Sequence, residues 1–271
     1  MLPSLLAGGP SGPRKLSSPL CASKMTRWLN CGVISQVSWP KTEKTVKYGV
    51  HIFILRPLTE KHSASVHIPL NGMTHVQGMT VINRFLSALA WKNDQPTITH
   101  NGFSGSSVPQ AIPVYQVPLG YSTTDCFPNE LIEIKDEKCL RAIALYREGL
   151  GSLHNVPFKF LSFFKVLNVF WNDKKTKGVN PLVEGIRAEL PNLADRDAQA
   201  RIAEIGKQHV DVAEYLYKYG RCAVAHAFQK PVVDPDDVAD LHGLSENLWL
   251  MRRLAAHVIF KHFGIKQSLF S

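Results

Sequence analysis

The hydrophobic pattern of the chain changes near residue 136, and this change constrains the fold more than any other feature. Before it, short runs of β-branched and aromatic residues alternate with polar turns, whereas after it apolar residues recur at helical spacing. The 271 residues are 45% hydrophobic and 20% charged, which is enough for a sizeable buried core. We therefore predict an α+β protein, with a β-rich module followed by an all-α antiparallel helical bundle.

The first half, over residues 25–118, is expected to form the mixed β-rich module. The stretches VKYGVHIFIL (residues 46–55) and SASVHIPL (residues 63–70) have the composition of strands, and a polar, proline-containing segment separates them. They are expected to pair as a hairpin. One helix is expected over residues 74–92, where apolar residues recur at helical spacing.

Two segments of the chain are expected to lie outside these units. Residues 1–24 contain much Ser, Pro and Gly and no acidic residue, which predicts a disordered leader, with a transit peptide as the alternative. Residues 119–135 are expected to be a linker.

Five cysteines without metal-site spacing favour free thiols in a reducing, cytoplasmic compartment, and no apolar run reaches membrane-spanning length.

The second half, over residues 136–271, is expected to form the bundle. The aromatic-rich segment at residues 157–171 predicts a central, buried helix. The final helix is expected to begin with Asp234 as its cap and Pro235 in its first turn, and to stop at Gly264. The helices are expected over residues 136–150, 157–171, 181–190, from 197 onward, 210–228 and 234–263.

The charge balance favours a polyanionic partner, because the net charge is +9 and the isoelectric point is about 9.3. Common catalytic signatures, such as GxSxG, HExxH, GxGxxG and a P-loop lysine, are absent from the sequence, so it predicts no metal and no cofactor. In the final helix, Arg252, Arg253 and His257 are expected to form a solvated face.

Arg221 and His226 are the candidate functional residues, because they stand in the otherwise small and apolar run GRCAVAHA. Five residues of an ideal α-helix turn through roughly 500°, which leaves the two side chains about 140° apart. We therefore expect no tight pair within one helix. Either Gly220 loosens the helix and redirects Arg221, or the residues line a groove shared by two copies of the bundle.

The segment RCAVAHA resembles the Arg-x(4–6)-His motif of HEPN domains, all-α bundles that include metal-independent endoribonucleases. The wider frame resembles the methylamine-utilisation MauJ group, whose members end in a HEPN-like bundle. This resemblance covers residues 139–263 and extends loosely to INRFLSALAW in the first half. It rests on the stretches ALYREGL, VPFKFLSFFKVLNVFW, EYLYKYGRCAVAHA and VDPDDVADL.

The resemblance implies RNA cleavage or RNA binding across a homodimer groove. His226 would be the acid and base, since histidine titrates near neutral pH, and Arg221 would hold phosphate oxygens. Many active HEPN ribonucleases carry a polar residue after the arginine, where this chain has Cys222. Cys222 beside His226 also permits a thiol nucleophile, although an inert core cysteine is the commoner role of such a residue.

An alternative function remains open, namely a non-catalytic accessory or scaffold protein. In that case Arg221 forms a structural ion pair with Asp236 or Asp237, and the β-rich module recognises a protein partner. Glu148, on the first bundle helix, is a further candidate neighbour of the groove. Whether the protein is an enzyme is therefore left open by the sequence.

Overall fold

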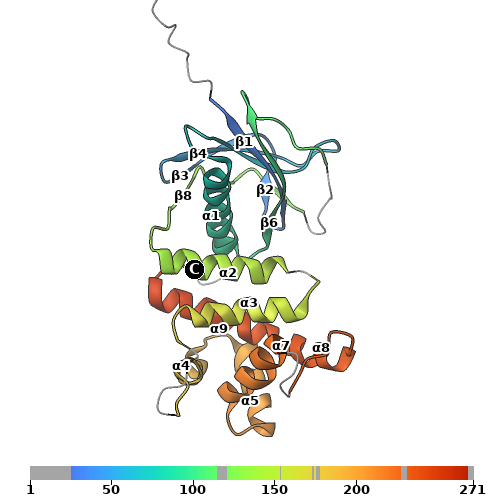
Figure 1. Ribbon diagram of the computed structural model, residues 1–271, viewed down its shortest axis with the longest axis vertical. Helices are drawn as coiled ribbons and strands as arrows, with labels where there is room; N and C mark the ends of the chain where they lie inside the picture. The colour runs from blue at the N-terminus through green and yellow to red at the C-terminus, as the bar shows by residue number, and fades with distance from the viewer. Residues whose placement is uncertain are drawn as a thin grey trace, which may run out of the picture.

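The computed structural model describes residues 26–114, 121–152, 154–172, 174, 178–226 and 231–267. The expected leader, residues 1–24, lies outside these ranges. The molecule is elongated, with a sheet at one end and the helical bundle at the other, as Figure 1 shows. The α+β prediction is confirmed.

A six-stranded sheet forms the N-terminal part, in the order β6-β1-β5-β4-β3-β8. All neighbours are antiparallel except β3 and β8, and a separate parallel pair joins β2 and β7. The strands are β1 (Trp28–Ser35), β2 (Trp39–Pro40), β3 (Lys44–Tyr48), β4 (His51–Arg56), β5 (Ser65–Pro69), β6 (Thr97–Ser106), β7 (Thr123–Thr124) and β8 (Glu130–Leu131).

Residues 46–55 were expected to be one strand, and this was wrong. The chain turns between β3 and β4 at Gly49, which has a φ of 59°, a left-handed conformation that glycine adopts without steric cost. The expected pairing with residues 63–70 does form, because β4 and β5 are antiparallel neighbours. Two short strands, β7 and β8, lie within the segment that was expected to link the halves.

Helix α1 (His75–Asn93) covers one face of the sheet, as residues 74–92 indicated. Thr74 caps it through a capping box with Gln77. Its Phe85 stacks on Phe53 of β4 with ring centroids 4.4 Å apart, and both rings are fully buried. This packing forms the core of the N-terminal part.

The opposite face of the sheet carries a buried polar cluster of Asn30, Ser65 and His67, all at most 1% exposed. The His67 ring contacts Ser65 Oγ through Nε2 at 2.9 Å and Asn30 Oδ1 through Nδ1 at 2.8 Å. Burial, and secondarily the charge of Arg56, lowers the pKa of His67 to about 4. His67 is therefore neutral at neutral pH, as a buried ring needs to be.

The helical bundle is built around α2, α3 and α9, which lie side by side. Within the described residues its elements are α2 (Glu137–Gly151), α3 (Val156–Asn168), α4 (Pro181–Glu189), the 3₁₀ turn η1 (Leu190–Asn192), α5 (Arg196–Gln208), α6 (Val212–Tyr215), the π-helix η2 (Leu216–Cys222), α7 (Ala223–Ala225), α8 (Val238–Glu246) and α9 (Leu248–Phe263). Helix α3 supplies fully buried rings from Phe160, Phe163 and Phe164, as a central helix should.

The final helix differs from the prediction in two ways. It begins at Val238 with Asp237 as its cap, not at Asp234, because the Asp237 side chain accepts from the backbone N–H of Ala239. It is also split at Asn247 into α8 and α9. The predicted stop is confirmed, since Gly264 ends α9 with a φ of 66°.

A junction cluster of Asp94, Tyr146 and Arg252 joins the two halves. Asp94 follows α1 and is 1% exposed. The Tyr146 hydroxyl donates to its Oδ1 at 2.6 Å, and Arg252 Nη2 lies 2.7 Å from both its backbone oxygen and its Oδ2. Burial, together with the Asp94 carboxylate, raises the pKa of Tyr146.

The expected solvated face on α9 was therefore wrong. Arg252 binds Asp94, Arg253 pairs with Asp195 at 3.1 Å, and His257 contacts Glu189 at 3.1 Å. The polar face of this helix meets acidic residues on neighbouring elements, and no periodicity within one helix can reveal such partners.

Candidate functional site

The candidate pair lies on a helix that changes its winding. Asp211 caps α6, and the chain then continues through the π-helix η2 into α7. The π segment packs on α3 at Gly220, where an added Cβ would lie 2.3 Å from Cζ of Phe160. Glycine is therefore required for this close approach. Short π segments occur frequently at functional sites.

Arg221 and His226 contact each other within one chain. Nη1 of Arg221 lies 3.2 Å from Nε2 of His226, so the expectation that the two side chains diverge was wrong. Two features account for the difference. Arg221 lies in a π-helix, and His226 lies past the end of α7 with an extended backbone (φ −127°, ψ 113°), so the angle of an ideal α-helix does not apply.

Both side chains are half-buried, which leaves each partly open to solvent. Arg221 also lies over the ring of Tyr217, with Cζ 5.7 Å from the ring centroid. Because a guanidinium only donates hydrogen bonds, Nε2 of His226 is the acceptor in their contact, and the proton of the neutral ring lies on Nδ1. The pair thus presents a fixed cation beside a histidine lone pair.

Cys222 lies next to the pair, with its Sγ 3.8 Å from Nη1 of Arg221. It is half-buried, and the four cysteines in the described ranges are free thiols. Asp237 is engaged as the cap of α8, and the backbone N–H of Asp236 donates to Oδ1 of Asp234. Both aspartates are exposed.

Glu148 lies in a different groove, between α2 and β6. That groove is lined by Thr99, Arg141 and Arg147 as well as Glu148. Arg147 is held there by the backbone oxygen of Asn83 at 3.0 Å. The structure therefore brings Arg221, Cys222 and His226 together, while Glu148 belongs to the junction of the two halves.

Sequence reasoning missed Tyr217 and the close packing of Gly220 on α3, although it included Gly220 as a residue that could loosen the helix and redirect Arg221. The dipeptide Tyr219-Gly220 before Arg221 was a usable signal, since a glycine inside a helix often marks close packing. Tyr217 lies four residues before Arg221, a spacing at which helical side chains meet. Tyr217 and Gly220 both contact rings of α3, and the sequence around residues 217–221 does not reveal these contacts.

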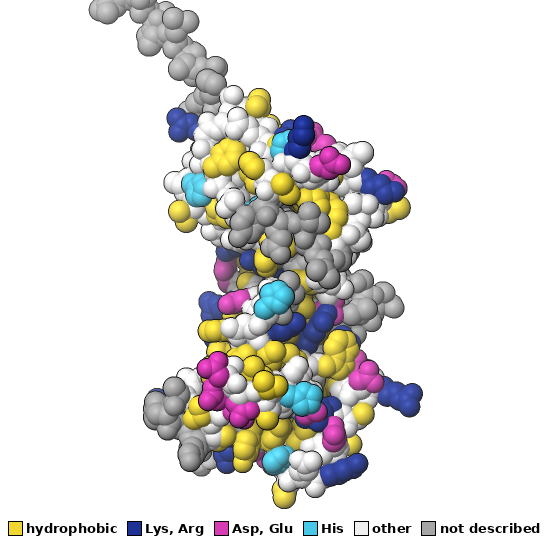
Figure 2. Space-filling view, turned by 90° about the vertical axis from the view of Figure 1, so that its right-hand side faces the viewer, with side chains coloured by type: hydrophobic (Ala, Val, Ile, Leu, Met, Phe, Trp, Pro, Cys, Tyr) yellow, Lys and Arg dark blue, Asp and Glu magenta, His cyan; other side chains and the backbone are white. Residues whose placement is uncertain are grey.

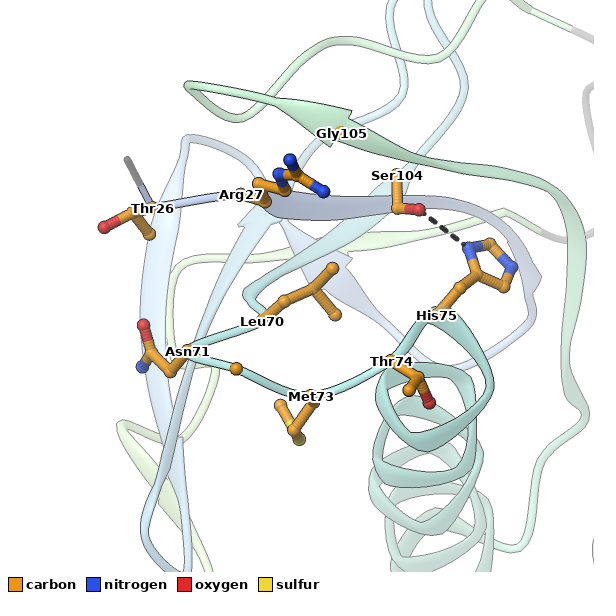
Figure 3. A pocket seen from close by; sticks show the side chains of 10 residues that line it. Thr26, Arg27, Leu70, Asn71, Met73, Thr74, His75, Ser104 and Gly105 are labelled. Carbon is orange, nitrogen blue, oxygen red and sulfur yellow. Dashed lines mark hydrogen bonds between the residues drawn. The ribbon is translucent and has the colours of Figure 1, made fainter. Parts of the chain in front are cut away.

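A separate hollow of about 790 Å³ lies at the start of α1, in the N-terminal half. Its wall includes Arg27, Thr74, His75 and Ser104, and Figure 3 shows His75 Nδ1 beside Ser104 Oγ, 3.1 Å apart. No sequence motif pointed to this hollow. None of the candidate residues lines it.

The surface charge near the bundle is mixed. On the face shown in Figure 2, the described lysine and arginine side chains are scattered and alternate with acidic ones, without a continuous basic patch. Among the residues that the structure describes, no three His, Cys, Asp or Glu side chains gather as metal ligands would. Within the same ranges, no helix is long and apolar enough to cross a membrane.

Comparison with known proteins finds a matching family for the helical bundle and none for the sheet. Residues 142–260, from the middle of α2 to the last turn of α9, match the family model described as methylamine utilization protein MauJ. No curated protein matches the chain. No solved structure matches it either. The helical C-terminal half of this chain is therefore MauJ-like.

Proposed function

We propose that Arg221 and His226 form an RNA site that binds a phosphodiester and cleaves it without a metal ion. The observation that carries this proposal is the 3.2 Å contact between Nη1 of Arg221 and Nε2 of His226. It sets a permanent cation and a proton acceptor side by side on a half-buried surface. The resemblance of this segment to the HEPN motif supports the choice of RNA.

Arg221 supplies the charge that phosphate binding needs. A guanidinium stays charged at all physiological pH values and binds two phosphate oxygens at once. The ring of Tyr217 lies under its guanidinium group, which limits the number of rotamers that Arg221 can adopt. In the transition state, the same donors stabilise the charge that builds up on the phosphate oxygens.

His226 supplies the proton transfer. When phosphate oxygens bind Nη1 of Arg221, they displace the ring of His226, and Nε2 then accepts the proton of the 2′-hydroxyl. The 2′-oxygen forms a bond to phosphorus while the bond to the 5′-oxygen breaks. The products are a 2′,3′-cyclic phosphate and a 5′-hydroxyl, and the second product needs a proton from an acid.

We further propose that two copies of the bundle pair so that their sites face one groove. One imidazole per chain cannot act as base and acid at the same instant, and a second copy supplies the protonated ring. Sedimentation at micromolar concentration tests this proposal directly. A monomer that cleaves RNA would contradict it.

The test of the proposed function is cleavage of a labelled single-stranded RNA of mixed sequence, in the presence of a metal chelator. We expect wild type to cleave it, and Arg221→Ala and His226→Ala each to lower the rate at least about 100-fold. Each variant should keep its fold, with a change of about 1 kcal/mol or less in the free energy of unfolding, because both side chains are half-buried.

Matched controls remove the same kind of side chain elsewhere. Arg84 pairs with Glu137 on the surface of α1, and His242 lies on α8 with 74% of its side chain exposed. Arg84→Ala and His242→Ala should cleave at the wild-type rate. Unfolding of either site variant, or full activity in both, contradicts the proposal and favours a non-catalytic role for the bundle.

A further inference from the structure

A small slot lies beside the candidate pair, between the π-helix and α8. It has a volume of about 160 Å³. Tyr215 and Tyr219 form one wall, and Ala239 and Gly243 of α8 lie on the other. Val232, from the segment that joins the two helices, also lines it. The small residues on α8 leave room opposite the two aromatic rings.

The aromatic wall is held in place. The rings of Tyr215 and Tyr219 stack with centroids 5.3 Å apart, and His209 stacks on Tyr215 at 4.3 Å. The amide of Asn247 donates to the Tyr215 hydroxyl at 3.2 Å. Tyr219 is nevertheless 48% exposed, which leaves part of its ring open to a ligand. Fixed, partly open tyrosine rings attract cations through their negative faces.

Among the described residues that line the slot, the charge has one sign. Asp240 is the charged residue among those that line it, and no described lysine or arginine does so. Its Oδ2 accepts from the backbone N–H of Asp234 at 3.0 Å, which fixes the carboxylate. Asp234, Asp236 and Asp237 are exposed on the segment that leads into α8 and add to the negative field. A phosphate or carboxylate ligand would be repelled here.

We propose that this slot binds a small organic cation, of the alkylammonium class. The volume admits a group of a few carbon atoms around one nitrogen, the tyrosine rings and apolar side chains contact the methyl groups, and Asp240 balances the charge. This function is independent of RNA cleavage, because Arg221 and His226 do not line the slot. The same helix thus carries an anion site and a cation site.

The experiment is a titration of the full chain with tetramethylammonium chloride, followed by the NMR signals of the tyrosine rings, against sodium chloride at equal ionic strength. We expect saturable shifts at Tyr215 and Tyr219. Neopentyl alcohol, which has a similar size and no charge, should bind at least about tenfold more weakly. Tyr219→Leu should weaken tetramethylammonium binding about threefold to tenfold.

The matched pair of variants is Asp240→Asn and Asp236→Asn, because each removes one negative charge. The asparagine at position 240 keeps an oxygen that accepts from Asp234. Asp240→Asn should weaken binding about tenfold, whereas Asp236→Asn, outside the slot, should change it less than about twofold. Absence of saturable shifts, equal binding of neopentyl alcohol, or equal effects of the two variants would overturn the proposal.

Discussion

Two polar clusters that each contain an arginine occupy different places in this molecule, and they differ most in their burial. The junction cluster surrounds Asp94, which is 1% exposed and is bound by both Tyr146 and Arg252. The Arg221–His226 pair is half-buried and lies at the end of a short π-helix. A buried, bonded cluster holds elements together, whereas a partly open one remains accessible to a ligand.

The chemistry of the side chains does not by itself assign a role. Both clusters contain an arginine. At the junction its partner is a buried carboxylate whose charge would be costly to leave unpaired, so the pair is structural. At the candidate site its partner is the half-buried His226, and the proposed function requires that a phosphate displace this ring.

The largest expected effect tests the junction. Asp94→Ala leaves Arg252 and the Tyr146 hydroxyl without their shared acceptor, and we expect the free energy of unfolding to fall by about 3–5 kcal/mol. Urea denaturation measures this change. The control is Glu137→Ala, which breaks the exposed ion pair between Arg84 on α1 and Glu137 on α2 and should cost less than about 1 kcal/mol.

Equal losses in the two variants would contradict the structural role of the junction cluster. A second urea transition in Asp94→Ala would show in addition that the two halves unfold separately once the cluster is removed. The present geometry favours one transition in wild type, because the cluster joins α1, α2 and α9.

The next largest effect concerns the buried His67, which, unlike the half-buried His226, is closed to solvent. The pKa of His67 is lowered to about 4 from an ordinary 6.5, so its stabilising contribution is fully present above 6.5 and is lost as pH falls through about 4. As pH falls from 6.5 to about 4, residue 67 takes up a proton in the unfolded chain while it stays neutral in the folded chain. Wild type should therefore lose about 3 kcal/mol more than His67→Gln between neutral pH and a pH below 4.

Denaturant unfolding of both proteins across this pH range gives the difference. The contributions of the carboxylates and of the other histidines to the free energy of unfolding cancel in this difference, because these groups titrate in both proteins. Parallel pH profiles for the two proteins would show that His67 does not contribute in this way.

A smaller effect tests whether the π-helix depends on the close packing at Gly220. Gly220→Ala places a Cβ against the ring of Phe160 on α3, where the nearest atom is 2.3 Å away, and should cost about 1–3 kcal/mol. Gly206→Ala on α5 meets only Val212, at 4.0 Å, and should be neutral or slightly stabilising. Thermal unfolding of the two variants measures the contrast, and equal stabilities would mean that η2 does not depend on this contact.

Local signals predicted much of the fold. Helical spacing over residues 74–92 predicted α1, the aromatic-rich segment at residues 157–171 predicted the central α3, and Gly264 stops α9 as predicted. These signals depend only on neighbouring residues. The turn at Gly49 was missed because the strand composition on both sides of it is continuous.

The candidate residues came from the sequence, whereas their geometry did not. Arg221 and His226 were identified from the sequence, yet their contact lies next to a π-helix in which Gly220 packs closely on Phe160, 60 residues away. The same limit applies to Arg252, whose partner Asp94 lies on the other half of the molecule. Long-range partners decide which polar residues are buried.

The proposed function requires that RNA reach the Arg221–His226 pair, and a titration of the full chain with a short, non-cleavable 2′-O-methyl RNA measures this access. The imidazole NMR signals of His226 and His67 are followed in the same samples. We expect saturable shifts at His226, with no change at His67, and loss of the His226 shifts in Arg221→Ala. Unchanged His226 signals at saturating RNA, or equal shifts in Arg221→Ala, would contradict it.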